Sequence, residues 1–301
     1  RDNLSDTGKE PSTGGLSISP DIIVRKNIVS DPAVTLGDIT VDPGSDKVEI
    51  GNDNYLYARI HNPGSQPTDA AVRFYFAPLT TSCSPLSWVF IDEVDILAVP
   101  TGGFKVSATV TWPNVPDPGT ANHFCLIAVC GNTTDPFPDT SMIDSASDFI
   151  EFMRSSNNIA YRNVTFENID PDGWGKIPFV MHGFSREMED YDLVFDGSKL
   201  PEGSHIDIKT WRRLLEGKNV ELENIKKLRD GKLKRKIILR IGDGNFGAVR
   251  NLRFSYKLKP RFDIYIHLSR KARHKKEYPV RIVQKLGREE IGHITIMVKC
   301  I

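Results

Sequence analysis

The sequence predicts an all-β protein built from two immunoglobulin-like β-sandwich domains in tandem. From Ser19 onward, short segments rich in β-branched and aromatic residues alternate with clusters of Pro, Gly, Asn and Asp, and almost no stretch has a helical period. Seven such segments precede residue 167, and seven is the strand number of an immunoglobulin-like sandwich. A turn-rich stretch at 167–178 (ENIDPDGWGKIP) lies where the charge balance changes sign, so it marks the expected division.

Each alternating segment is assigned to a strand in chain order. In the first half we expect strands at 21–26, 55–61, 70–77, 87–97, 104–112, 122–130 and 158–166. In the second half we expect strands at 177–182, 190–196, 204–209, 234–241, 249–258, 261–268, 278–285 and 291–299. One short helix is expected at 209–216 (KTWRRLLE), where Trp211, Leu214 and Leu215 fall on one face.

The chain therefore divides into three expected parts. Residues 1–18 form a linker or flexible N-terminal segment, 19–166 an acidic first domain, and 167–301 a basic second domain. No apolar run reaches the roughly 18 to 20 residues that span a bilayer, so no transmembrane segment is expected. Residues 1–20 lack the basic start and apolar stretch of a signal peptide, and the chain does not begin with Met, so we expect a mature product or a piece of a longer protein.

The net charge of zero conceals a division between the halves. Residues 1–166 contain 10 Lys and Arg against 20 Asp and Glu, whereas residues 167–301 contain 29 against 19. Opposed surface charges steer encounter and set orientation. The sequence therefore favours attraction, either between the two domains of one chain or head to tail between chains, and salt should weaken it.

The first half resembles a known family. Its alternating strands YLYARIH and AAVRFYFA are joined by a turn containing Asn62-Pro63-Gly64, and the closing strand is NNIAYRNVTF. These features are similar to the CARDB modules, a family of bacterial and archaeal cell-adhesion-related immunoglobulin-like domains. The resemblance covers about residues 19–166 and departs from the family in inserts around Cys83 and at 131–153. It implies a non-catalytic module that binds, spaces or orients neighbouring parts of an extracellular protein, and it supplies no catalytic residue.

A glycine motif in the second half imitates a nucleotide-binding loop. IGDGNFGAVR at 241–250 satisfies the kinase formula through Gly242, Gly244 and Gly247. The lysine, catalytic-loop and Asp-Phe-Gly motifs of a kinase do not follow in the 51 residues after Arg250, and the next segment alternates like a strand. The three glycines therefore indicate a hairpin turn that needs positive φ.

Metal and catalytic patterns are weak. NIDPDGWG at 168–175 imitates a calcium loop, but its twelfth position is Phe179 where a Glu is needed, so a linker turn is favoured over calcium; the acidic loop of Asp42, Asp46, Asp53 and Asn54 is read in the same way. No two of the seven histidines have the spacing of a zinc pair, and no GxSxG or HExxH motif is present. We expect no enzyme, catalytic residue or cofactor.

The four cysteines leave two alternatives open. Cys125 and Cys130 are five residues apart on one strand, so they face opposite sides and cannot bond to each other. Cys83 could form a bridge with either, or all four residues, Cys300 included, could be reduced.

Two basic runs supply the expected interaction surface. KKLRDGKLKRK (226–236) and RKARHKK (270–276) hold Lys226, Lys227, Arg229, Lys232, Lys234, Arg235, Lys236, Arg270, Lys271, Arg273, Lys275 and Lys276. Docking against an acidic domain is favoured, ahead of a solvated sheet edge kept from sticking by lysine. An acidic polymer is the third alternative; nucleic acid is disfavoured because the nearby aromatics alternate at the spacing of a core strand.

These observations converge on one function class and one alternative. The sequence favours a non-catalytic adhesion, assembly or positioning module of a secreted or cell-surface prokaryotic protein, which associates with a protein partner or with itself. The alternative is the accessory C-terminal region of a secreted hydrolase, a protease, whose catalytic domain precedes Arg1. The Gly, Ser and Pro-rich start PSTGGLSISP has the composition of a linker from such a domain.

Overall fold

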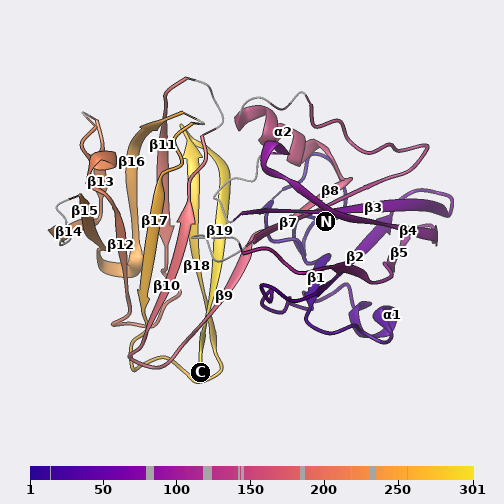
Figure 1. Ribbon diagram of the computed structural model, residues 1–301, viewed down its shortest axis with the longest axis horizontal. Coiled ribbons are helices and arrows are strands. Elements are labelled where there is room, and N and C mark those ends of the chain that lie inside the picture. The colour runs from indigo at the N-terminus through magenta and orange to yellow at the C-terminus, as the bar shows by residue number, and fades with distance from the viewer. Residues whose placement is uncertain are drawn as a thin grey trace.

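The protein consists of two β-sandwiches that lie side by side (Figure 1). The computed structural model describes residues 1–13, 15–78, 85–117, 124–141, 143, 146–183, 187–217, 219–230, 235–255 and 257–301. Strands dominate the described residues, with only two short α-helices, α1 (Pro32–Leu36) and α2 (Ala146–Ser155). The expected all-β fold class is therefore confirmed.

The first sandwich has two facing sheets. One sheet contains β1 (Ile22–Arg25), β2 (Asn54–Asn62), β5 (Gly103–Val106) and β6 (Val110–Trp112), with β1, β5 and β6 all paired with β2. The other has the order β4 (Val89–Val99), β3 (Thr68–Pro78), β7 (Phe124–Gly131) and β8 (Ile159–Arg162). Alternating side chains such as Leu56, Phe74 and Leu126 point into the space between the sheets and form one buried cluster.

The second sandwich is larger. One sheet has the order β10 (Trp174–Val180), β17 (Arg261–His267), β12 (His205–Trp211), β15 (Lys236–Ile241) and β14 (Ile225–Asp230). The other has the order β13 (Glu221–Glu223), β16 (Phe246–Phe254), β11 (Glu189–Asp196), β18 (Glu277–Leu286), β19 (Glu289–Cys300) and β9 (Val164–Ile169). Its core is dense in large side chains such as Phe179 and Phe262, whose ring centroids lie 5.3 Å apart.

The chain crosses from one sandwich to the other at Asn163. The expected strand 158–166 is divided there: β8 pairs with β7 in the first sandwich, and β9 pairs in parallel with β19 in the second. The change of sheet thus falls three residues before the expected division. The turn at 167–178 joins β9 to β10, and both strands belong to the second sandwich.

A shared core joins the two sandwiches. One cluster of buried hydrophobic residues contains Ile127 from the outer face of β7, Met153 from α2 and Ile291 from β19. Helix α2 provides much of this contact, because Phe149, Ile150 and Met153 lie on its buried face and it packs near β19. An interface that excludes water from large apolar side chains stabilises one relative placement of the halves.

Three local expectations differ from the structure. The helix expected at 209–216 is wrong: Trp211 still pairs with Lys236 as the end of β12, so only one 3-10 turn (η3, Arg212–Leu215) fits before Gly217. Helix α2 was missed because it lies within the loop-like stretch 131–153. The expected strand 104–112 is interrupted between β5 and β6, where Ser107 Oγ accepts a hydrogen bond from Ala58 N.

The N-terminal segment also departs from the expectation of a linker. Asp2, Asn3 and Ser12 are buried, and Arg154 Nη1 donates a hydrogen bond to the carbonyl of Ser12 at 2.9 Å. Residues 1–13 therefore pack as part of the first sandwich.

Two further 3-10 turns are η1 (Pro85–Ser87) and η4 (Asp243–Asn245). No helix among the described residues is long and apolar enough to span a membrane.

Candidate functional site

A cleft opens between the two sheets of the first sandwich. Its volume is about 520 Å³, within the range of small-ligand sites. Strands β2, β3, β7 and β8 provide its walls, and the turn between β2 and β3 provides its rim. The wall and rim residues include Ile22, Ala58, Ile60, His61, Asn62, Pro63, Ala70, Val72, Ala128, Cys130, Asn132, Asn158 and Ala160.

A gradient of side-chain size produces this cleft. Along β7 the inward residues decrease from Phe124 and Leu126 to Ala128, while β3 decreases from Phe74 through Val72 to Ala70 in the same direction. The large residues at one end fill the core and the alanines at the other leave it open. Protein interiors are packed closely, so an unfilled space of this size is a specific feature of the sequence.

A buried charged cluster lies at one margin of the cleft. Asp21 Oδ1 accepts a hydrogen bond from Arg59 Nε at 2.8 Å, and Asp21 Oδ2 accepts one from Arg1 Nε at 2.8 Å. His61 Nε2 lies 3.1 Å from Asp21 Oδ2. Burial alone raises the pKa of a carboxyl group, but the hydrogen bonds from Arg1 and His61 outweigh it and hold the pKa of Asp21 well below its usual range.

Within this cluster, Arg59 also stabilises the backbone of neighbouring segments. Its side chain is fully buried, and its guanidinium also donates to the carbonyls of Pro20, Asp38 and Val41. The loop before β2 is thereby tied to the sandwich. The guanidinium groups of Arg1 and Arg59 are both used in pairing with Asp21, and Asp135 also lines the cleft, so the charged groups of the lining balance one another.

The His61-Asn62-Pro63-Gly64 turn forms part of the rim. Asn62 Nδ2 donates hydrogen bonds to the carbonyls of Gln66 and Val99, and Asn62 Oδ1 accepts one from Gly64 N at 2.9 Å. A Cβ on residue 64 would meet Asn62 Oδ1 at 2.9 Å, which favours glycine there. His61 stacks on Phe104 with ring centroids 5.7 Å apart and keeps about a quarter of its side chain exposed. Asn62 is therefore structural, whereas His61 faces the cleft.

Cys130 provides a thiol in the cleft wall. Burial raises its pKa to about 11, so the thiol stays protonated near neutral pH and is a poor nucleophile. Cys125 lies on the opposite face of β7, where it belongs to the core shared with the second sandwich. This confirms the expectation that the two cysteines face opposite sides. Cys300 is buried, and Cys83 lies outside the described residues.

A second polar cluster lies at the junction of the two sandwiches. Ser17 Oγ is 2.7 Å from His293 Nε2, and His293 Nδ1 is 2.5 Å from Glu290 Oε1. This order of groups is that of a serine hydrolase triad. Both Ser17 and the His293 side chain are almost completely buried, however. The adjoining space of about 220 Å³ is lined by Phe149, Ile150 and Met153 of α2 and by the charged side chains of Arg154, Arg281 and Glu290. The cluster satisfies buried polar groups at the junction.

The basic residues expected to form an interaction surface belong to two different places. Lys226 and Lys227 lie on β14, Arg235 directly precedes β15, and Lys236 begins β15; the side chain of Arg229 and all of Lys232 and Lys234 lie outside the described residues. Arg270, Lys271, Arg273, Lys275 and Lys276 lie between β17 and β18. The two runs are not brought together as one patch.

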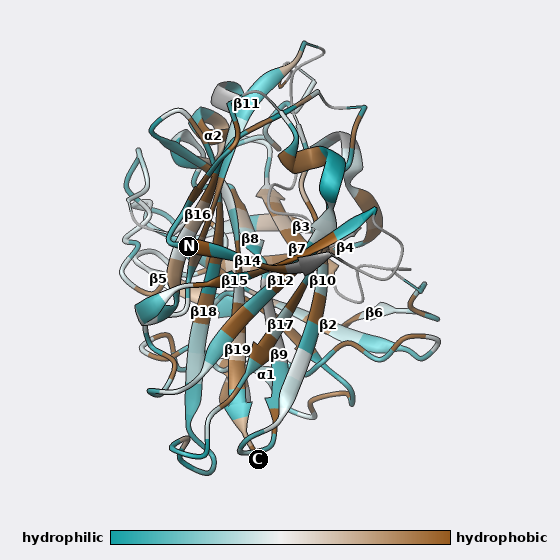
Figure 2. Cartoon of the chain, turned by 90° about the vertical axis from the view of Figure 1, so that its left-hand side faces the viewer, coloured by the Kyte–Doolittle hydropathy of each residue, from teal (hydrophilic) through white to brown (hydrophobic). Residues whose placement is uncertain are grey.

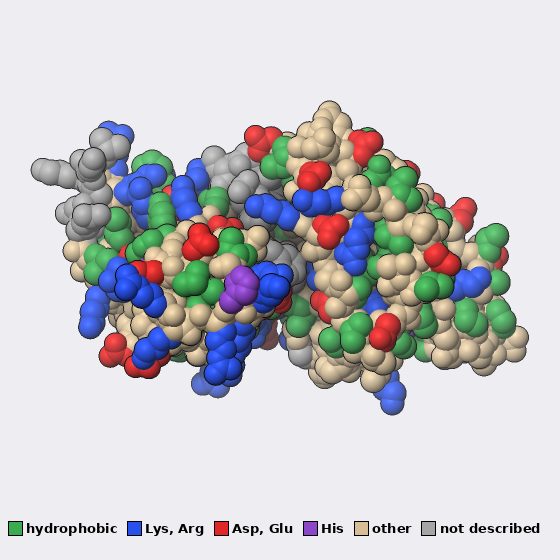
Figure 3. All heavy atoms as spheres, turned by 90° about the horizontal axis from the view of Figure 1, so that it is seen from below, with side chains coloured by type: hydrophobic (Ala, Val, Ile, Leu, Met, Phe, Trp, Pro, Cys, Tyr) green, Lys and Arg blue, Asp and Glu red, His purple; other side chains and the backbone are tan. Residues whose placement is uncertain are grey.

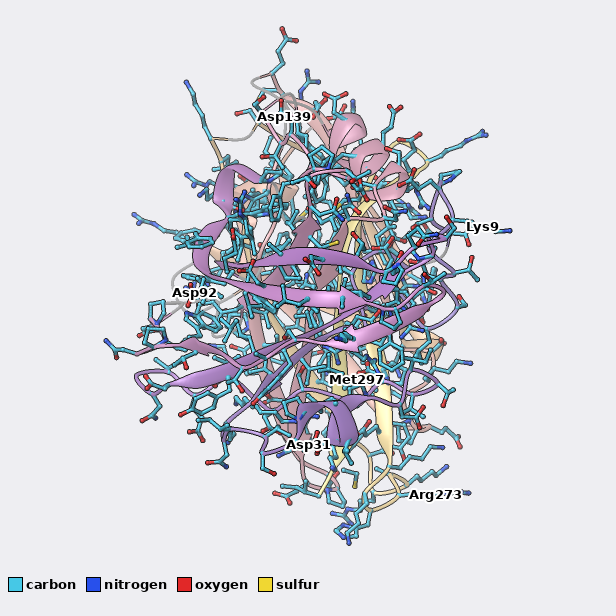
Figure 4. The ribbon with its side chains drawn as sticks, turned by 90° about the vertical axis from the view of Figure 1, so that its right-hand side faces the viewer. Lys9, Asp31, Asp92, Asp139, Arg273 and Met297 are labelled. Atoms are coloured by element: carbon cyan, nitrogen blue, oxygen red, sulfur yellow. The ribbon has the colours of Figure 1, made fainter. Side chains whose placement is uncertain are left out.

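Neither run is placed against the first sandwich. In Figure 1, β14 and β15 lie at the edge farthest from it. Arg270 pairs with Asp172 at 2.9 Å and Lys271 with Glu202 at 2.6 Å, both within the second half. Figure 4 shows Arg273 projecting away from the molecule near its lower end. The described residues of both runs therefore stay largely exposed. Figure 3, a view from below, shows Lys and Arg side chains gathered over the second sandwich.

The glycine motif at 241–250 connects two sheets. Gly244 has φ of 76° and Asn245 has φ of 53°, which supports the need for positive φ. The expected hairpin is wrong, however, because β15 and β16 belong to different sheets of the second sandwich. Asn224 Nδ2 stabilises this connection by donating a hydrogen bond to the carbonyl of Asp243 at 3.1 Å.

The acidic side chains of the two calcium-like loops are paired with other groups of the protein. Asp172 has φ of 64°, and its carboxylate pairs with His267 and Arg270. Asp42 pairs with Arg162 at 3.0 Å, and Asp53 accepts a hydrogen bond from Asn114 N. Among the residues that the structure describes, no group of three or more His, Cys, Asp or Glu side chains is arranged to hold a metal ion.

Sequence reasoning missed the cleft and the charged cluster beside it. The sequence shows the alternation of apolar residues along β2 and β7. It does not show that Ala58 and Ala128 face the same space, because this depends on how the two sheets pack. One signal was present: small residues follow large ones at every second position of β7. In the sequence, His61 only ends the alternating strand YLYARIH before the turn at Asn62-Pro63-Gly64.

The comparisons with known proteins do not assign the chain. No family model matches it, and no curated protein matches it. Among solved structures, the C-terminal domain of the Streptococcus pyogenes antigen I/II-family protein AspA is similar at 8% identity, over 92% of this chain and 99% of that one, with a TM-score of 0.21.

Two further structures are similarly distant. The major pilin subunit BcpA of Bacillus cereus has 9% identity over 81% of this chain and 69% of that one, with a TM-score of 0.22. A family 123 glycoside hydrolase from Clostridium perfringens has 11% identity over 52% of this chain and 25% of that one, with a TM-score of 0.26. At these scores the similarities carry no argument about activity or partners.

Proposed function

We propose that this chain is a non-catalytic recognition and positioning module of a secreted or cell-surface prokaryotic protein. The observation that carries the proposal is the inter-sheet cleft of the first sandwich, with its apolar alanine-lined walls and its polar rim. The resemblance of residues 19–166 to CARDB modules supports the same class. The core shared by the two sandwiches fits a module that holds its neighbours in one orientation.

The occupant of the cleft is an extended, largely apolar segment of a partner protein. Apolar side chains would fill the space left by Ala58, Ala128 and Ala160. The polar side chains of Asn132 and Asn158 at the rim offer hydrogen bonds to a peptide backbone.

A peptide selection tests this function. A displayed library of random peptides is selected on the full chain and then tested against Ala128→Leu, which fills the cleft. We expect selected peptides that are rich in apolar residues and lose at least about tenfold in affinity for the filled variant. Ala98→Leu, at an exposed position on β4, is the matched control, and its affinity should be unchanged.

Unchanged peptide binding by Ala128→Leu would place recognition elsewhere and contradict the proposal. Thermal unfolding of the variant must show a folded protein. An extra side chain in a true cavity costs little stability, whereas the same change in a packed core costs about 1–3 kcal/mol.

Assembly is the second part of the proposal. The exposed basic residues of the second sandwich would meet the acidic first sandwich of another copy, in a head-to-tail array. Light scattering at low and high salt tests it, since such contacts weaken as salt screens them. A monomer at every concentration and salt level would exclude self-association and leave the proposal for the cleft unaffected.

A further inference from the structure

The outer face of the sheet β10-β17-β12-β15-β14 carries a distinctive mixture of aromatic and basic side chains. Side chains alternate between the two faces of a strand, so Ile206 and Ile208 of β12 enter the core while their neighbours point outward. Figure 2, which turns this side of the molecule to the viewer, shows hydrophobic and hydrophilic residues alternating along these strands. The outward residues are therefore available to solvent or to a ligand.

Register places the outward aromatic residues in rows across the sheet. Trp174 is paired with His267, which in turn is paired with His205. Tyr265 lies in the next outward row. Trp211 is six residues beyond His205 on β12, so it lies about 20 Å along the strand from the first row. The aromatic side chains thus extend over a distance of several sugar rings.

Two of these aromatic residues are exposed to an unusual degree. The exposed fraction is 52% for Trp174 and 38% for Trp211. Next to Trp174, the buried atoms His205 Nε2 and His267 Nδ1 have no hydrogen-bond partner among the described residues. Large aromatic faces left open to water beside unmet polar groups are typical of binding surfaces.

Basic residues are interleaved with the aromatics. The outward set has six basic residues, Lys176, Lys209, Lys226, Lys236, Arg240 and Arg261, and only two acidic ones, Asp207 and Asp263. Both carboxylates are paired with arginines. Arg240 Nε and Nη2 donate to the Asp207 carboxylate at 2.6 and 2.8 Å, and Arg261 Nη2 donates to Asp263 Oδ1 at 3.3 Å. The four lysines remain as net positive charge.

Two of these lysines lie beside the aromatic rings. Lys236 Nζ is 5.6 Å from the Trp211 ring centroid, and Lys176 Nζ is 5.9 Å from that of Tyr265. Edge lysines that prevent sheet aggregation explain Lys226 on β14. Protection of a sheet edge does not explain the exposed tryptophans on β10 and β12. A ligand that stacks on aromatic rings and carries negative charge would explain the tryptophans and the lysines together.

We propose that this face binds an acidic polysaccharide. The apolar C–H faces of sugar rings would pack on Trp174, Tyr265 and Trp211, and the carboxylate or sulfate groups would pair with the lysines between them. Because Asp207 and Asp263 are already paired with arginines, only the four lysines remain to bind acidic groups. Such sparse positive charge fits a glycan with separated carboxylate or sulfate groups better than the continuous phosphates of a nucleic acid. The surface is separate from the cleft of the first sandwich, so the two proposals fail independently.

Binding of the full chain to alginate, polygalacturonate and heparin tests the proposal, measured by titration calorimetry beside neutral dextran and oligothymidylate. We expect one or more of the acidic polysaccharides to bind, with affinity decreasing as salt rises. Trp174→Ala and Trp211→Ala should each weaken this binding by about tenfold or more. Lys176→Glu should weaken it as well and reduce its salt dependence.

Controls use exposed residues outside this face. Phe90→Ala removes a side chain that is 53% exposed on β4 of the first sandwich, and Lys9→Glu changes a lysine that projects into solvent in Figure 4. Neither should alter binding. The proposal is overturned if no acidic polysaccharide binds, if dextran binds as tightly, if the tryptophan variants bind like the wild type, or if oligothymidylate binds more tightly than every glycan.

Discussion

Ser17 Oγ and His293 Nε2 lie 2.7 Å apart across the junction of the two sandwiches, although 276 positions separate them in the sequence. The neighbouring Asn163 Nδ2 donates to the carbonyl of His293 at 2.7 Å. Both contacts are buried, where each unpaired polar group costs free energy. The junction is thus held by specific hydrogen bonds as well as by apolar packing.

Replacing His293 with alanine should destabilise the whole chain. The change leaves the Ser17 hydroxyl without its partner and opens space at the junction, so the free energy of unfolding should fall by about 2–4 kcal/mol. Urea denaturation measures it, and His274→Ala at an exposed position is the control. Equal midpoints for His293→Ala and the wild type would show that the junction contributes little.

Asp21 is the second position where one change should have a large effect. Asp21→Asn leaves Arg59, which is fully buried, without its compensating charge, so we expect a loss of about 3–5 kcal/mol in the free energy of unfolding. Glu49→Gln breaks only the exposed pair with Lys26 and should change stability little. If Asp21→Asn lowered the free energy of unfolding as little as Glu49→Gln does, Arg1 and Arg59 would have found other partners.

The strand pattern of the sequence predicted most of the fold. Expected strands such as 55–61 and 190–196 agree closely with β2 (Asn54–Asn62) and β11 (Glu189–Asp196), because alternation on a half-buried sheet has a clear period of two. The connections were less predictable. That β15 and β16 belong to different sheets depends on how whole sheets pack, and the turn residues between them do not encode it.

The candidate site was not predictable from local pattern. Asp21, Arg59 and His61 are each ordinary in the sequence, and their cluster exists because β1 pairs with β2 in one register. The outer face of the second sandwich was partly visible: Lys226 and Lys236 were identified as surface residues, while Trp174 and Trp211 were read as a turn residue and a helix residue. Rows across a sheet become apparent only when strand order is known.

The partly buried position of His182 should make stability depend on pH. Burial, with a contribution from Lys259, lowers the pKa of His182 to about 4, so the imidazole is neutral in the folded chain. Its unfolded pKa is about 6.5, so the unfolded state takes up a proton first as the pH falls. Stability from this group is therefore lost between about pH 6.5 and pH 4, by about 2–3 kcal/mol.

His182→Gln tests that dependence. The variant has no group that titrates at this position, so its free energy of unfolding should fall less steeply over the same pH interval. Urea denaturation at several pH values measures both slopes, and His274→Gln serves as the exposed control. Parallel curves for His182→Gln and the wild type would assign the acid sensitivity to other groups.

Gly242 and Gly247 should be sensitive because of close packing around the connection from β15 to β16. A Cβ on residue 242 would lie 2.0 Å from Asn224 Oδ1 and 3.0 Å from the Asn224 carbonyl oxygen, and one on residue 247 would lie 3.0 Å from the same carbonyl oxygen. Gly242→Ala should therefore lower the free energy of unfolding by about 1–3 kcal/mol.

Gly8 provides a matched comparison, since its φ is 76° but nothing lies within 4 Å of an added Cβ. Gly8→Ala should cost only the backbone strain of a left-handed residue, about 1 kcal/mol. Differential scanning calorimetry of the variants separates the two causes. If Gly242→Ala were no worse than Gly8→Ala, Asn224 would have moved aside, and the glycine at 242 would not be required by the approach of that side chain.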